Sequence, residues 1–160
     1  MTELELPKTI KMVITDFDGV MTDNNVYISE DHKSSRRLNF RDIMGVYNLK
    51  RNDIKVAIIS GDKSAAIDVL AKNIGLNDVY QNVRIKIDVL KSILGKYSLS
   101  QEEYVYIGDE VIDLECLEFA KYKVTVPQAH KKVKEIPGIQ ITQADAGEGA
   151  FREVADCLTD

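Results

Sequence analysis

Short apolar runs alternate along the chain with segments of helical periodicity. Four runs are rich in β-branched or aromatic residues and apolar at consecutive positions, as strands buried on both faces are. They lie at residues 12–15, 56–59, 104–107 and 124–126. Weaker runs lie near Val79 and at 139–141. Because helical segments separate the runs, the pattern predicts an α/β fold with a parallel sheet.

Three segments between these runs carry apolar residues at helical spacing. The first spans 63–74, and Gly75 follows where a helix would end. The same spacing recurs at 87–97 and, over a shorter stretch, at 114–120. We therefore predict that helices connect the strands of the sheet.

Residues 26–40 break this alternation. An apolar stretch at 26–28 is followed by polar residues through Arg37 and then by Leu38 and Phe40. This pattern predicts a β-hairpin, at about 25–40, directly after the first strand. The hairpin would lie at the edge where open α/β sheets keep their ligand crevice.

The composition is that of one globular domain. The 160 residues are 44% hydrophobic and 29% charged, and no proline- or glycine-rich linker divides them. We expect a single domain over 1–160 with a C-terminal tail at about 145–160 and no room for a cap domain. No apolar run of membrane-spanning length occurs, and Glu3 and Glu5 stand where a secretory signal would be basic. These features predict a cytoplasmic protein without a membrane partner.

Charge and cysteine usage narrow the partners further. Acidic residues outnumber basic ones by 26 to 21, and basic residues cluster only at Lys131, Lys132 and Lys134. We expect a solvated helix face there and no nucleic-acid partner. Cys116 and Cys157 lack the short Cys and His spacings of zinc or redox sites, so we expect two buried free thiols.

Two carboxylates follow the first predicted strand. Asp16 and Asp18 are separated by one residue, so strand alternation directs both side chains the same way. With an ordinary pKa of about 3.9, Asp16 would be ionised at neutral pH and could attack phosphorus unaided. Mg²⁺ would offset the charge repulsion, and Asp18 could transfer protons.

A plain turn built from Asp16, Asp18 and Gly19 is an alternative for this segment, because Asp and Gly are common turn residues. A calcium loop of the helix-loop-helix type is excluded. Tyr27 stands where that loop needs its bidentate glutamate, and Gly19 misses the turn position.

Two further candidates involve phosphate. Ser60, Gly61 and Asp62 follow the second strand, where a hydroxyl and backbone N–H groups could cradle phosphate or simply cap a helix. Lys86 precedes the 87–97 stripe, where its charge opposes the helix dipole. It could bind phosphate or be a solvated surface lysine.

Carboxylates also gather after the third strand. Asp109, Glu110 and Asp113 stand where a helix begins, and Asp109 and Asp113 could share one face. Acidic residues are also favoured there by the helix dipole alone. The helix dipole does not explain why four groups of such residues, at Asp16, Ser60, Lys86 and Asp109, each stand at the end of a strand or helix.

In chain order these sites spell Asp-x-Asp-Gly, Ser, Lys and Gly-Asp-Glu-x-x-Asp, which resembles the four motifs of the haloacid dehalogenase superfamily. The continuation of the first motif through Thr22 and Asp23, the capless length and the segment 147–153 look like one branch of it. This is the 3-deoxy-D-manno-octulosonate 8-phosphate phosphatase branch, which includes phosphatases of nine-carbon sialic-acid-type 9-phosphates. The resemblance implies a Rossmann-like three-layer fold with the hairpin inserted after the first strand.

The resemblance also implies roles for the acidic residues. Asp16 would be the nucleophile and a Mg²⁺ ligand, and Asp18 the general acid/base and a ligand through its backbone carbonyl. Asp109 would complete the metal ligands. Asp113 and Glu110 would support them.

Ser60, Gly61 and Lys86 would hold the phosphoryl group, again by resemblance. The candidate substrate contacts are Thr22, Asp62 and Arg152. Relatives of this branch are typically homotetramers in which the hairpin and the tail of neighbouring subunits close the site. A homotetramer is therefore expected here as well.

Three positions depart from the branch pattern. Glu110 replaces the second Asp of the last motif, and Ala146 stands where a further glycine is common. Asp62 stands where we associate Arg with the eight-carbon branch and Glu with the nine-carbon branch, so it favours a nine-carbon sugar acid.

The expected function is Mg²⁺-dependent hydrolysis of a phosphorylated 2-keto-3-deoxy sugar acid through a phosphoaspartyl intermediate. A bacterial receiver domain has similar residues but in another order along the chain. The remaining alternative is a non-catalytic partner domain of a sialic-acid cytidylyltransferase system, since Glu110 also resembles the residue at this place in such domains.

Overall fold

The computed structural model describes residues 2–160 and is built around a six-stranded sheet in the order β5-β4-β1-β6-β7-β8. The strands are β1 (Met12–Thr15), β4 (Lys55–Ile59), β5 (Asp78–Tyr80), β6 (Tyr104–Ile107), β7 (Tyr122–Thr125) and β8 (Gln140–Ile141). Every neighbouring pair is parallel. The predicted parallel α/β sheet is confirmed, including its two weaker strands.

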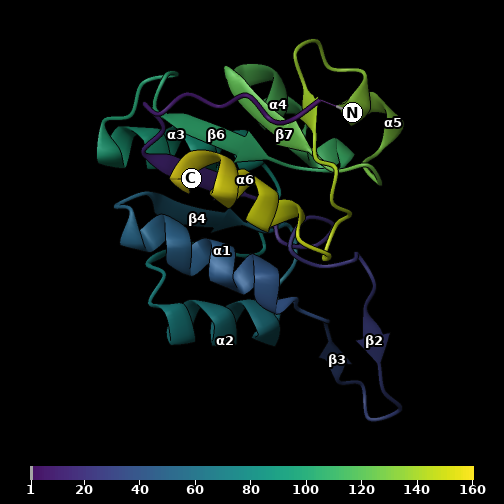
Figure 1. Ribbon diagram of the computed structural model, residues 1–160. Helices are drawn as coiled ribbons and strands as arrows, with labels where there is room; N and C mark the ends of the chain where they lie inside the picture. Colours follow the sequence, from purple (N-terminus) through teal and green to yellow (C-terminus); the bar gives the residue numbers. More distant parts are fainter. Residues whose placement is uncertain (1) are drawn as a thin grey trace.

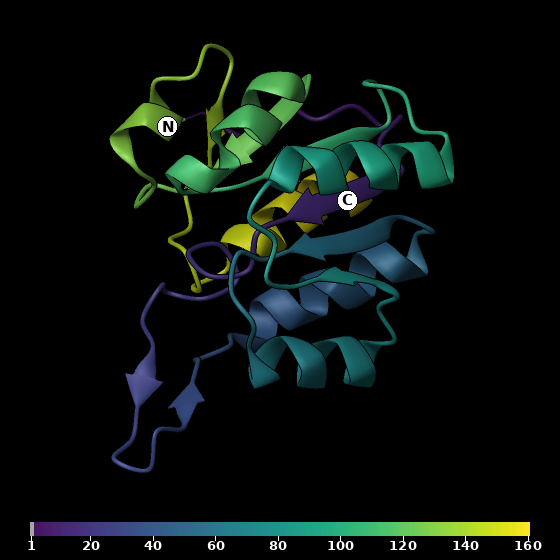
Figure 2. The ribbon, with the colours of Figure 1, turned by 180° about the vertical axis from the view of Figure 1, so that it is seen from behind.

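Helices cover both faces of the sheet (Figures 1 and 2). They are α1 (Phe40–Arg51), α2 (Ala65–Ile74), α3 (Lys86–Tyr97), α4 (Leu114–Phe119), α5 (Lys131–Lys134) and α6 (Ala150–Thr159), with a 3₁₀ turn, η1 (Val111–Asp113), before α4. One core cluster joins α1, α2 and α6 to the sheet, and the other joins α3, α4 and α5. The three-layer architecture expected from the resemblance is therefore present.

Alternation along the strands divides the core. In β1, Val13 packs into the cluster beneath α1, α2 and α6, whereas Met12 and Ile14 pack on the opposite side. All three side chains are fully buried. This burial on both faces explains why the strands read as continuous apolar runs in the sequence.

Helix α1 was not predicted from the sequence. Its buried residues are Asp42, Gly45, Val46 and Leu49, which have helical spacing but are only half apolar. Gly45 lies against α6, where a Cβ would be 3.1 Å from the Cα of Arg152. The close contact between α1 and α6 requires glycine at this position. The buried face of α1 therefore lacks the continuous apolar pattern that would have predicted a helix.

The C-terminal segment, predicted as a tail, is largely helical. Helix α6 buries Ala150, Phe151, Val154, Ala155 and Leu158 and lies alongside α1 (Figure 1). The five apolar residues have helical spacing, so this helix was visible in the sequence although a tail was predicted. Within the predicted tail, residues 145–149 precede the helix and belong to no helix or strand.

The predicted hairpin is present, but its strands are short and it ends before Phe40, which begins helix α1. β2 (Tyr27–Ile28) and β3 (Ser34–Ser35) pair antiparallel, and the arm projects from the body of the molecule (Figures 1 and 2). Val26, Tyr27 and Ile28 are exposed on it. We call residues 25–38 the arm.

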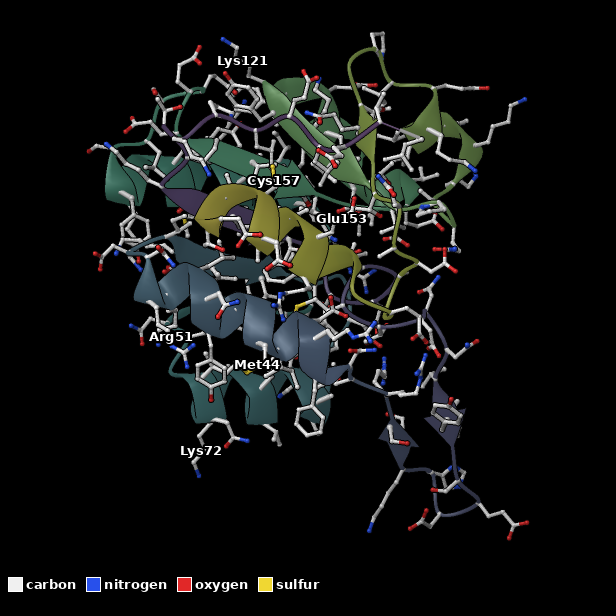
Figure 3. The ribbon with its side chains drawn as sticks, in the orientation of Figure 1. Met44, Arg51, Lys72, Lys121, Glu153 and Cys157 are labelled. Carbon is white, nitrogen blue, oxygen red and sulfur yellow. The ribbon has the colours of Figure 1, made fainter. Side chains whose placement is uncertain are left out.

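Other predictions concern the surface. The three lysines of α5 are exposed, as expected for a solvated face. Both cysteines are free, but only Cys116 is buried. Cys157 is half-buried on α6, where its Sγ donates to the carbonyl of Leu4 at 3.3 Å (Figure 3). Among the helices of residues 2–160, none has the length and apolar character needed to cross a membrane.

A matched pair of valines tests the packing of α6. Val154 is fully buried in α6, whereas Val69 is 57% exposed on α2. We expect Val154→Ala to lower the free energy of unfolding by about 2–3 kcal/mol through lost burial and a residual cavity. Val69→Ala should change it by less than about 0.5 kcal/mol. Urea unfolding of both variants measures the difference, and equal effects would contradict the packing described for α6.

Candidate active site

Three adjacent strands bring the predicted site residues together. β4, β1 and β6 are neighbours in the sheet, and Asp16, Ser60 and Asp109 follow their carboxyl ends. In a parallel sheet these ends open on one crevice. Lys86, the first residue of α3, completes the group from the neighbouring layer.

Lys86 is the cationic centre of this site. Its side chain is 1% exposed, and its ammonium lies 3.0 Å from Oδ1 of Asp16 and 2.9 Å from Oδ1 of Asp113. Burial opposes its charge, but the two carboxylates more than compensate and hold the Lys86 pKa above its ordinary value. The alternative of a solvated surface lysine is therefore wrong.

Asp113 organises the loop after β6. Its Oδ1 accepts hydrogen bonds from Lys86 and, at 2.7 Å, from the Tyr106 hydroxyl. Its Oδ2 accepts from the backbone N–H groups of Asp109 at 3.1 Å and Glu110 at 3.3 Å. A Cβ on Gly108 would lie 2.5 Å from Cγ of Asp113, so only glycine allows this approach.

Asp109 carries the main indication of a cation site. Its Oδ1 is buried and has no hydrogen-bond partner within residues 2–160. An unpaired carboxylate oxygen in such surroundings is strongly disfavoured unless a cation approaches it. Gly19, at φ +83°, makes room for this carboxylate, because a Cβ there would lie 1.9 Å from Oδ2 of Asp109.

Oxygen ligands suit Mg²⁺ at this position. One carboxylate oxygen each from Asp16, Asp109 and Asp113 lie within 4.8 Å of one another. Both oxygens of Asp113 are already engaged by hydrogen bonds, which leaves Asp16 and Asp109 as the carboxylates that would hold the ion. An all-oxygen set of this kind fits Mg²⁺.

The pKa of Asp16 departs from the ordinary value that the sequence prediction used. Burial, and then the charge of Asp113, raise the pKa of Asp16 well above its ordinary value, while Lys86 opposes the shift. Burial raises the pKa of Asp109 as well. The Lys86 ammonium, 3.0 Å from Oδ1 of Asp16, is the neighbour that favours the ionised form of the proposed nucleophile.

Ser60 and Gly61 lie at the end of β4 with Ser60 buried. The helix that follows is capped by Ser64, whose Oγ accepts from the N–H of Ala66 at 3.1 Å, so α2 begins at Ala65 rather than at residue 63. Ser60 is therefore not the helix cap that the alternative interpretation required. Its Oγ accepts from the N–H of Asp62 at 3.3 Å, and donation of its hydroxyl hydrogen to a phosphate oxygen stays a prediction.

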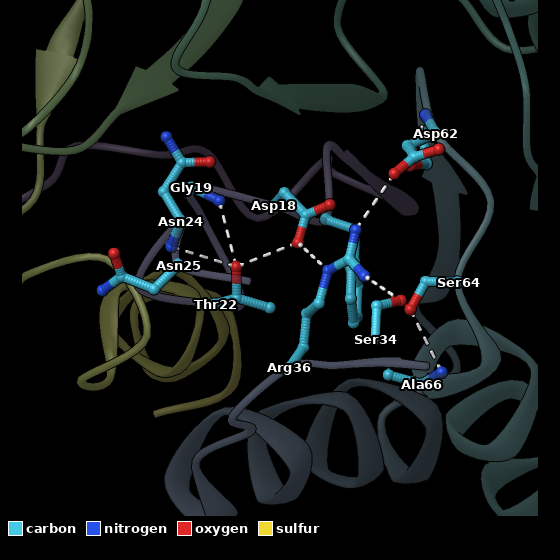
Figure 4. Close-up of polar contacts among 12 residues, drawn as sticks. Asp18, Gly19, Thr22, Asn24, Asn25, Ser34, Arg36, Asp62, Ser64 and Ala66 are labelled. Carbon is cyan, nitrogen blue, oxygen red and sulfur yellow. Dashed lines mark hydrogen bonds and ion pairs between the residues drawn. The ribbon is translucent and has the colours of Figure 1, made fainter. Parts of the chain in front are cut away.

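Asp18 is not part of the carboxylate cluster of Asp16, Asp109 and Asp113. Its Oδ1 accepts from the hydroxyl of Thr22 at 3.2 Å and from Nε of Arg36 at 3.3 Å (Figure 4). Arg36 also binds Asp62, which is otherwise exposed. The predicted substrate residues Thr22 and Asp62 thus lie beside Asp18. Arg36 escaped the sequence analysis because nothing distinguishes it from Arg37.

Glu110 and Arg152, two further predicted site residues, do not contact Asp18 or Arg36 through their side chains. Glu110 caps the η1 turn, with its side chain accepting from the N–H of Val111 at 2.7 Å. Arg152 lies on α6, where its Nε is 2.6 Å from Asp156 on the same helix. The substrate role of Arg152 stays a prediction.

A second unpredicted residue, Asp42, ties the C-terminal segment to the site. It is buried in α1 and accepts from the N–H groups of Gly149 at 3.2 Å and Arg152 at 3.0 Å. The N–H of Gly147 donates to the carbonyl of Val20 at 3.0 Å. We call these contacts the α6 latch, because they hold the turn before α6 against the loop after β1.

Comparison with known proteins agrees with this geometry. A family model described as haloacid dehalogenase-like hydrolase matches residues 20–153. The chain is 32% identical over 152 residues to the 3-deoxy-D-manno-octulosonate 8-phosphate phosphatase KdsC of Escherichia coli strain K12, covering 94% of this chain and 80% of that protein.

Solved structures show the same architecture. The 3-deoxy-D-manno-octulosonate 8-phosphate phosphatase of Moraxella catarrhalis, in complex with magnesium, phosphate and KDO, has a TM-score of 0.89 and 28% identity. The match covers 94% of this chain and 86% of that one. The cobalt-bound phosphatase of Haemophilus influenzae has a TM-score of 0.88 and 28% identity, with 94% and 88% covered.

The unpaired oxygen of Asp109 generates a prediction about metal binding. At a concentration about 100 times its dissociation constant, Mg²⁺ should raise the melting temperature by roughly 5–10 °C. Asp109→Asn should remove most of this shift while leaving the metal-free protein at least as stable, because it removes a buried carboxylate. Differential scanning fluorimetry measures both effects.

Asp88→Asn is the matched control, since Asp88 is exposed on α3. Its Mg²⁺-dependent shift should equal that of the wild type. An undiminished shift in Asp109→Asn would place the ion elsewhere.

Proposed function

The chain belongs to the haloacid dehalogenase-like hydrolase family, and we propose that it is a Mg²⁺-dependent phosphatase of a phosphorylated 2-keto-3-deoxy sugar acid. The observation that carries the proposal is the placement of Asp16. Its carboxylate lies between the Lys86 ammonium and the carboxylate of Asp109, beside the end of β4 where Ser60 lies. Such a site is suited to attack on a phosphate ester.

In the first step, the Asp16 carboxylate attacks phosphorus and forms a phosphoaspartyl group, while the bond from phosphorus to the sugar oxygen breaks. Asp18 gives its proton to that oxygen. Lys86 keeps Asp16 ionised and offsets the charge of the transferred group, and the Ser60 hydroxyl donates to a phosphoryl oxygen. When bound, Mg²⁺ supplies further charge compensation between nucleophile and phosphate.

In the second step, Asp18 takes a proton from water as the water oxygen attacks the phosphorus of phospho-Asp16. The bond from phosphorus to the Asp16 oxygen breaks and inorganic phosphate leaves. Asp18 thereby regains the proton that the next cycle needs, and Asp16 returns to its carboxylate form.

The substrate class follows from the relatives and the chain's own departures from them. KdsC of Escherichia coli is named for an eight-carbon sugar acid 8-phosphate. Asp62, which stands where we associate Arg with the eight-carbon branch, favours a nine-carbon sugar acid 9-phosphate instead. Both compounds carry the phosphate on a primary alcohol, so the two-step chemistry above is the same for either.

The proposal includes a cytoplasmic homotetramer. Support for self-association comes from the arm, where Val26, Tyr27 and Ile28 expose apolar side chains together. Light scattering after size exclusion measures the assembly, and a monomer at micromolar concentration would contradict it. Ile28→Lys, on the most exposed of the three, should lower the measured mass, whereas Lys72→Glu on the outer side of α2 should not (Figure 3).

Phosphate release from a panel of eight- and nine-carbon sugar acid phosphates tests the activity. We expect hydrolysis of at least one ester with Mg²⁺ present and at least about a hundredfold less after chelation. No release from any ester would reject the phosphatase proposal and favour the non-catalytic partner domain.

Asp16→Asn tests the nucleophile. The amide has the shape of the carboxylate but cannot attack phosphorus, so kcat should fall at least about a thousandfold. The fold should persist, because the buried Lys86 ammonium keeps Asp113 as its partner. Circular dichroism and kcat are measured together, and near-normal turnover would refute the nucleophilic role.

A further inference from the structure

Most of the arm is exposed, but Arg36 and Leu38 are partly buried. The side chain of Arg36 is 7% exposed, whereas that of the adjacent Arg37 is 45% exposed. Alternation of side chains along the arm directs Arg36 toward the crevice, and Arg37 toward Asp23 and Glu148. The arm therefore delivers one buried positive charge to the region beside Asp18.

All three guanidinium nitrogens of Arg36 have partners (Figure 4). Nη2 donates to Oδ2 of Asp62 at 3.0 Å and Nη1 to Oγ of Ser34 at 3.3 Å. Nε donates to Oδ1 of Asp18 at 3.3 Å. Because the guanidinium is planar and rigid, fixing two nitrogens fixes the direction of the third. Asp62 and Ser34 thus aim Arg36 at Asp18.

Asp18 is held from two sides through one oxygen. Its Oδ1 also accepts from the Thr22 hydroxyl, which itself accepts from the N–H groups of Gly19 at 3.3 Å and Asn24 at 3.2 Å. Among the contacts of residues 2–160, no hydrogen bond involves Oδ2 of Asp18. One oxygen therefore orients the carboxyl group, and the other is available for proton transfer.

We propose that Arg36 is a positioning residue, which the arm supplies to hold the Asp18 carboxyl group in the direction that proton transfer requires. The inference rests on the proposed phosphatase function. A group that first gives and then takes a proton needs a fixed direction toward the reacting oxygen. Asp18, Asp62 and Ser34 use three of the five guanidinium N–H groups of Arg36, so the chain fixes this side chain without a substrate group.

The leaving group separates positioning from a purely structural role. A sugar alcohol must be protonated as it leaves, but p-nitrophenolate leaves without a proton. With enzyme in excess over ester, release of the alcohol reports only the first transfer. We expect Arg36→Gln to slow release from the best sugar acid phosphate about 10- to 100-fold. Release from p-nitrophenyl phosphate should slow less than about threefold.

Arg37→Gln is the matched control, because it removes the same charge from the adjacent position. It should leave both rates within about twofold of wild type. Guanidinium added at millimolar concentration to Arg36→Gly should restore part of the lost rate on the sugar ester, and Arg36→Lys should lie between wild type and Arg36→Gln.

The outcomes distinguish this inference from the proposed function. Equal slowing on both esters, or an equal effect of Arg37→Gln, would overturn the positioning role while leaving the phosphatase intact. A wild-type protein that hydrolyses neither ester would overturn the phosphatase proposal and this inference together.

Discussion

The buried ammonium of Lys86 is the interaction on which the rest of the site depends. It is the partner of both Asp16 and Asp113, which lie too deep for water to stabilise their charges. Without it, the ends of β1 and β6 would bring unpaired carboxylates together. The glycines at 19 and 108 serve the same arrangement, because they let Asp109 and Asp113 approach the backbone of these loops.

One ammonium does not balance three carboxylates. Burial, and then the charge of Asp113, raise the pKa of Asp16, and Oδ1 of Asp109 has no partner within residues 2–160. In a protein without a ligand at this site, an unpaired buried carboxylate oxygen would only reduce the stability of the fold. In a site that recruits Mg²⁺ and a phosphate ester, the same excess selects a divalent cation, which in turn favours the ionised nucleophile. The unpaired oxygen of Asp109 and the proposed chemistry of the site thus have one origin.

The sequence predicts features whose cause is local and misses those whose cause is distant. Buried strands are apolar on both faces, so β1, β4 and β6 were recognisable, and the order of Asp16, Ser60, Lys86 and Asp109 followed from the strand ends. Helix α1 was not, because its contact with α6 requires Asp42 and Gly45 on its buried face. Arg36 was not, because only the path of the arm separates it from Arg37.

These distant contacts converge on the loop after β1. Arg36 reaches Asp18 across 18 residues, and the N–H of Gly147, just before α6, donates to the carbonyl of Val20. The body of the sheet positions Asp16, the proposed nucleophile, through strand geometry. Asp18, the proposed proton donor, lies beyond the strand, on a loop outside the hydrogen-bond ladder of the sheet. The arm and the α6 latch hold this loop through contacts with distant parts of the chain. The arm, an insertion between two strands of the sheet, can therefore affect the proposed catalysis without touching substrate.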